Sequence, residues 1–119
     1  MIKFDEQKQL DSVAGALAIR KEIEGIAADV AGRGYKNICY LGIGGTYASA
    51  LQTQNHVQEY SGMEIIAQNA ALYNTTGNRR IGKDTVIVLS SVTGTTQEVV
   101  AAVEKAKAQG AVVIGFVDT

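Results

Sequence analysis

NICYLGIGGTYAS, residues 37–49, joins a short apolar run to a helix through a glycine-rich turn. The run from Asn37 to Leu41 is bounded by turn residues and has the length and composition of a buried strand. The residues from Thr46 to about Tyr60 have the pattern of a helix, which Ser61-Gly62 ends. The sequence therefore predicts a strand, a tight turn and a helix in direct succession.

A second segment of the same kind lies farther along the chain. The run from Asp84 to Leu89 is the clearest strand, and the turn SSVTGTT follows it at residues 90–96. The helix expected from Thr96 to Gln109 carries an apolar stripe and ends at Gly110. Five of the seven turn residues carry a hydroxyl group.

The remaining elements continue this alternation of helices and strands. We expect a leading helix from about Asp11 to Ala31, strands at 64–67 and 111–117, a possible short helix within 69–76, and a polar surface connection at 78–83. Apolar strands that alternate with helices predict a parallel sheet covered on both faces. The predicted fold is therefore α/β, a doubly wound, three-layer α/β/α sandwich.

Composition excludes several classes of protein. A chain of 119 residues with 46% apolar residues is long enough for one domain. The net charge of −1 argues against a nucleic-acid partner, and the apolar runs are too short for a membrane span. The amino terminus lacks the apolar core of a signal peptide, and no residues have the spacing of a metal site. We expect a cytoplasmic protein that binds no metal.

The two turns share a property that points to a ligand. Each precedes a helix, whose first amide groups are free donors and carry a partial positive charge. Each also follows a strand, and ligands of doubly wound sheets bind at the carboxyl ends of strands. Two such turns, lined by hydroxyl groups, would form a neutral cup for a phosphate group.

Two other interpretations of these turns stay open. A dinucleotide-binding turn needs a third small residue where Tyr47 stands, and Glu64 lies at the wrong end of its strand to bind a ribose. A purely structural role for the second turn is also possible, because Thr95 and Glu98 have the spacing of a capping box. Capping alone needs only one hydroxyl group, so a ligand explains the remaining hydroxyl residues better.

The two turns resemble those of the sugar isomerase (SIS) domain of phosphosugar isomerases, deglycases and deaminases. GGTYAS at residues 44–49 is similar to the small-residue loop after the first strand of that family, and SVTGTT at 91–96 is similar to its second loop. The resemblance covers about residues 35–119. It implies a phosphate-binding set of Gly44, Gly45, Thr46, Ser91, Val92, Thr93 and Thr96.

The resemblance also implies a function, partners and a domain arrangement. It suggests an enzyme that isomerises or deglycates amino-sugar or fructosamine 6-phosphates and needs no cofactor. The deglycase and deaminase branches are favoured over the glutamine-using branch because Val92 and Thr95 differ from the residues of that branch. Alternatives are a phosphosugar-sensing module and a nicotinamide-dependent oxidoreductase. Residues 1–119 would form one incomplete SIS-type domain, with a leading helix in 1–34 and the core in 35–119. We expect a homo-oligomer or a second SIS domain to supply the catalytic acid and base, which stay unknown.

Three further features are weaker candidates. His56 lies in the middle of a helix and is interpreted as a surface or structural residue. Cys39 lies within a strand and is expected to be a buried apolar residue. The basic residues Arg79, Arg80 and Lys83 are interpreted as a solvated loop that could attract an anionic substrate.

Overall fold

The computed structural model describes residues 3–118, which divide into two compact units at Gly34. The first unit consists of helices α1 (Glu6–Ala18) and α2 (Arg20–Arg33). The expected single helix from Asp11 to Ala31 is therefore wrong in two respects. The helix starts earlier, because the Asp5 carboxylate caps it by accepting from the Lys8 amide at 2.9 Å. It is interrupted at Ile19, whose backbone (φ −93°, ψ 6°) leaves the helical conformation.

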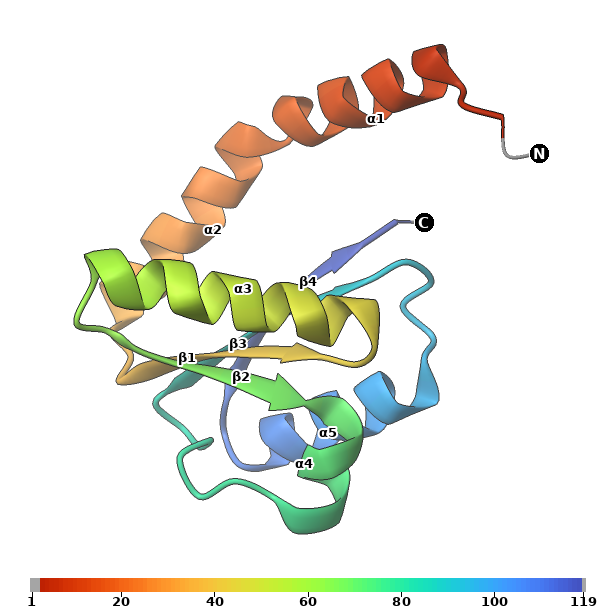
Figure 1. The fold of residues 1–119 in the computed structure, drawn as a ribbon. Helices are drawn as coiled ribbons and strands as arrows, with labels where there is room; N and C mark the ends of the chain where they lie inside the picture. Colours follow the sequence, from red (N-terminus) through yellow and green to blue (C-terminus); the bar gives the residue numbers. More distant parts are fainter. Residues whose placement is uncertain (1–2, 119) are drawn as a thin grey trace. The chain divides into compact units, whose positions relative to one another are not determined.

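The second unit is a four-stranded parallel sheet with helices on both faces (Figure 1). The strands lie in the order β2-β1-β3-β4. Helix α3 covers one face of the sheet, and α4 and α5 cover the other. This confirms the predicted three-layer α/β/α architecture. The elements in chain order are β1 (Asn37–Gly42), α3 (Gly45–Tyr60), β2 (Glu64–Asn69), α4 (Ala70–Thr76), β3 (Thr85–Ser91), α5 (Gln97–Ala108) and β4 (Val112–Val117).

The main core lies between the sheet and the α4–α5 layer. Alternate strand residues point into it, and small residues of α5 let that helix approach the sheet closely. Its best-buried members are each at most 1% exposed: Cys39, Leu41, Ala70, Tyr73, Ile87, Ala102 and Ala106. The short helix α4 resolves the ambiguous stretch at 69–76: Asn69 caps it by accepting from the Leu72 amide at 3.1 Å.

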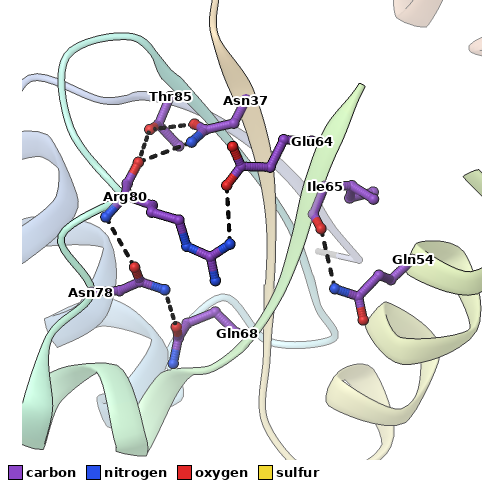
Figure 2. Close-up of polar contacts among 8 residues, drawn as sticks. All are labelled: Asn37, Gln54, Glu64, Ile65, Gln68, Asn78, Arg80 and Thr85. Carbon is purple, nitrogen blue, oxygen red and sulfur yellow. Dashed lines mark hydrogen bonds and ion pairs between the residues drawn. The ribbon is translucent and has the colours of Figure 1, made fainter. Parts of the chain in front are cut away.

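Buried polar groups hold together the amino-terminal edge of the sheet (Figure 2). The Thr85 hydroxyl donates to Asn37 Oδ1 at 2.7 Å, and the Asn37 amide donates to the Arg80 carbonyl at 3.0 Å. Outside this buried set, the solvent-exposed Arg80 guanidinium pairs with Glu64 at 3.1 Å. The connection at 78–83 is therefore not wholly a surface loop as expected, because Ile81 inserts into the core and is only 3% exposed.

On the other face, the side chain of Gln54 attaches α3 to the sheet. Its amide donates to the Ile65 carbonyl of β2 at 3.1 Å (Figure 2). Among the helices in residues 3–118, none is both long enough and apolar enough to cross a membrane.

Candidate functional site

The structure places the two turns at the same edge of the sheet. β1 and β3 are neighbours, and Leu41 pairs with Leu89 immediately before the turns begin. From this edge the chain leaves β1 for α3 on one face and leaves β3 for α5 on the other (Figure 1). Such a switch point, where successive connections diverge, opens a crevice in which doubly wound proteins bind ligands.

The first turn is closed by its own groups. Gly42 packs directly beneath the start of α3, since a Cβ atom there would lie 2.6 Å from the Thr46 carbonyl carbon and the Tyr47 amide nitrogen. Gly44 has φ +61° and ψ −124°, a conformation that L side chains rarely adopt. The Thr46 hydroxyl donates to the Ile43 carbonyl and accepts from the Ile43 amide, both at 3.0 Å. Thr46 therefore fixes the shape of the turn.

The second turn is closed in a similar way. The buried Ser91 hydroxyl accepts from the Gly94 amide at 3.1 Å, and Gly94 has φ +72°. The Thr93 hydroxyl accepts from both the amide and the hydroxyl of Thr95, at 3.2 and 2.9 Å. The capping-box interpretation is wrong, because the N-cap of α5 is Thr96 and not Thr95, and the Thr96 side chain makes no capping hydrogen bond.

The two helices that follow the turns, α3 and α5, both lack a side-chain cap, whereas α4, which starts after β2 at the same edge, is capped by Asn69. The N-caps are Gly44 for α3 and Thr96 for α5, and neither provides a side-chain hydrogen bond to the first turn. The first intrahelical donors are the amides of Ala48 and Val100, which bond to the N-cap carbonyls at 3.1 and 2.9 Å. The amides ahead of them have no acceptor within their own helix. An anion at this edge would supply that acceptor.

The site is electrically neutral apart from these helix ends. Residues 42–49 and 90–97 contain no Lys, Arg, His, Asp or Glu, and Glu98 is the first acidic residue after the second turn in the sequence. An anion would therefore be held by hydrogen bonds and helix dipoles rather than by a cationic side chain.

All seven residues predicted for phosphate binding lie on these two turns. Gly44, Gly45, Val92 and Thr93 are exposed, Thr46 and Thr96 are half-buried, and Ser91 is 9% exposed. Sequence analysis did not identify Asn74 of α4, whose side-chain amide donates to the Glu98 carbonyl at 2.9 Å. No sequence pattern marks it, because the contact joins elements 24 residues apart.

The weaker candidates lie away from this edge. His56 is exposed on α3 and its ring lies 5.1 Å from that of Tyr60. Cys39 is fully buried, and desolvation raises the pKa of its thiol to about 12, so the group is not a nucleophile near neutral pH. Arg80 lies at the amino-terminal edge, where the connection enters β3, so this basic segment does not contact the two turns.

Comparison with known proteins identifies the family. The family model for the SIS domain matches residues 33–119. The chain belongs to the SIS domain family. No curated protein matches the chain.

Solved structures share the SIS fold. A phosphosugar isomerase candidate from Salmonella typhimurium LT2 is 26% identical with a TM-score of 0.70, over 77% of this chain and 28% of that one. Tagatose-6-phosphate ketose/aldose isomerase from Escherichia coli has a TM-score of 0.76 at 16% identity, over 90% of this chain and 30% of that one. The C-terminal domain of glucosamine-fructose-6-phosphate aminotransferase from Francisella tularensis has a TM-score of 0.71 at 22% identity, over 88% of this chain and 29% of that one. The chain thus spans less than a third of each of these three structures.

Proposed function

We propose that the two turns bind the phosphate group of a sugar phosphate, and that the chain is part of an isomerase-type enzyme. The observation that carries this proposal is the pair of uncapped helix starts, which lie on neighbouring strands at one edge of the sheet. Membership of the SIS family and the isomerases among the structural neighbours support the substrate class.

In this proposal the seven residues have two kinds of role. The amides after Gly44 and Thr96 donate to phosphate oxygens, and the exposed glycines let the phosphate approach the backbone. The Thr96 hydroxyl makes no capping hydrogen bond, and the Ser91 hydroxyl accepts from the Gly94 amide, so each hydroxyl keeps its hydrogen for donation to the ligand. Thr46 and Thr93 hold the turns in shape.

The finer proposal is that the substrate is an amino-sugar or fructosamine 6-phosphate. Isomerisation or deglycation moves a proton next to a carbonyl or imine carbon, which requires a positioned acid and base. We propose that a second SIS domain or a second copy of the chain provides these groups, and that residues 1–119 form one domain with a leading segment in 1–34. A cytoplasmic location is part of the same proposal.

One observation favours a second candidate, a phosphosugar-sensing module without catalytic activity. The two turns offer no acid or base apart from the Tyr47 phenol. A turnover assay on the full protein separates the candidates, because a sensor binds the sugar phosphate without converting it.

The test of binding compares a hexose 6-phosphate with the free hexose in NMR titrations of the chain. We expect the phosphate ester, but not the free sugar, to shift the amide resonances of Gly44–Thr46 and Ser91–Val99. The amides of Asn78–Lys83 at the opposite edge are the internal control. Equal shifts with both ligands, or shifts confined to that basic segment, would contradict the proposal.

A further inference from the structure

The first turn of α5 keeps its helical conformation without a cap of its own. A helix start without a cap is less stable than a capped one, and its terminal turn frays readily. In this structure the support comes from outside the helix. The Asn74 side-chain amide of α4 donates to the carbonyl of Glu98, the second residue of α5, at 2.9 Å.

Helix α4 is itself firmly placed, so Asn74 donates from a fixed position. Its amino terminus is capped by Asn69. Tyr73, next to Asn74, is fully buried in the core, and its carbonyl accepts from Lys105 Nζ at 2.8 Å. The Tyr73 hydroxyl donates to Gln109 Oε1 at 3.0 Å. The contacts to Lys105 and Gln109 hold the carboxyl-terminal part of α5, whereas Asn74 donates a side-chain hydrogen bond to its first turn, where Val99 also packs into the core.

We infer that Asn74 is a positioning residue of the phosphate site. It holds the Gln97–Val99 amides in the orientation that an anion needs, and it acts through the Glu98 carbonyl without touching the ligand. Donors that are ordered before binding cost no ordering entropy when the phosphate arrives. This inference rests on the proposed function, since it assigns a role within the same site.

The test measures the affinity of the 119-residue chain for glucose 6-phosphate in the wild type and in Asn74→Ala, Asn74→Gln and Tyr73→Phe. Loss of one hydrogen bond that orders the donors should weaken binding about three- to tenfold in Asn74→Ala. Asn74→Gln retains a side-chain amide and should restore most of the affinity. Hydrogen exchange of the Val100 amide, which donates to the Thr96 carbonyl in the first turn of α5, should be faster in the free protein in Asn74→Ala only.

Tyr73→Phe is the matched control, because it removes a hydrogen bond between the same two helices at the far end of α5. It should leave the affinity unchanged even if it lowers the melting temperature as much as Asn74→Ala does. Equal affinities of Asn74→Ala and the wild type, or equal weakening by Asn74→Ala and Tyr73→Phe, would overturn the inference alone. If the wild type does not bind glucose 6-phosphate, the proposed function itself is wrong, and the inference falls with it.

Discussion

Gly42, Gly44 and Gly45 lie within four residues, and each tolerates a side chain to a different degree. A Cβ atom at Gly42 would meet backbone atoms of Thr46 and Tyr47 at 2.6 Å. At Gly44 there is space for a Cβ atom, but the backbone φ of +61° is one that L side chains rarely adopt. At Gly45 a Cβ atom would meet no atom within 4 Å apart from its own helix and its neighbours in the chain, and the residue starts α3. Alanine substitution at each position therefore separates a steric, a conformational and a ligand-related requirement for glycine.

The expected changes in stability follow from these values. In Gly42→Ala the first turn of α3 must move by about 0.8 Å to restore a 3.4 Å contact, at a cost of about 1–3 kcal/mol. Gly44→Ala forces an unfavourable backbone conformation at a cost of about 1–3 kcal/mol. Gly45→Ala should be neutral or stabilise the fold by up to about 1 kcal/mol, because alanine is the better helix former.

The three variants are expected to rank differently in phosphate binding than in stability. If the phosphate approaches the backbone at Gly45, a methyl group there occupies its space, and the affinity for glucose 6-phosphate should fall about tenfold or more. Gly45→Ala should thus be the variant that loses binding while it keeps full stability. No contact within residues 3–118 requires glycine at this position, whereas a ligand that approaches the backbone would account for it.

Thermal unfolding and calorimetric titration of the three variants measure both effects. For a unit of this size, 1–3 kcal/mol lowers the melting temperature by about 5–20 °C, which is easily resolved. Unchanged stability of Gly42→Ala would refute the steric argument and the close packing of α3 on β1. Unchanged affinity of a stable Gly45→Ala variant would refute the placement of the phosphate beside the first turn.

Three further predictions concern other parts of the chain. Thr96→Val should weaken glucose 6-phosphate binding about tenfold or more and leave the melting temperature nearly unchanged, because the Thr96 hydroxyl caps nothing. Equal loss of stability and affinity would make Thr96 a structural residue. Burial raises the pKa of the Cys39 thiol from 9.0 to about 12, so the unfolded chain releases a proton that the folded chain keeps. Stability should therefore fall between about pH 9 and 12, by up to about 1.4 kcal/mol per pH unit from this group, and urea unfolding of Cys39→Ala should lack that component. β4 is an edge strand with an exposed Phe116 and no charged residue from Val112 to Val117, so the chain should self-associate. Sedimentation velocity should show this self-association in the wild type and less of it in Phe116→Lys. A monomeric wild type would contradict the prediction.

Local patterns were sufficient to predict most elements of the second unit. The strands around Cys39 and Ile87 are short apolar runs, and such runs reflect burial on both faces of a parallel sheet. The glycines and hydroxyl residues of the two turns also lie in continuous stretches. These features depend on neighbours in the sequence, so they could be identified there.

Turn geometry and contacts between distant residues account for the errors in the second unit. Thr95 has the spacing of a helix cap, but the geometry of its turn directs its hydroxyl to Thr93. Ile81 stands in a polar stretch, yet it is buried when the connection crosses the end of the sheet. Asn74 has no distinguishing neighbours, and only the packing of α4 on α5 brings it to Glu98.

The sequence by itself determined the order of strands and helices after Gly34 and the residues of both turns, because apolar periodicity, glycine and hydroxyl groups act over a few residues. Only the tertiary structure decided that β3 lies beside β1 in the order β2-β1-β3-β4. Strand order depends on hydrogen bonds between segments far apart in the chain, which leave no local pattern. That order places the two turns on neighbouring strands, where both helix starts can act on one ligand.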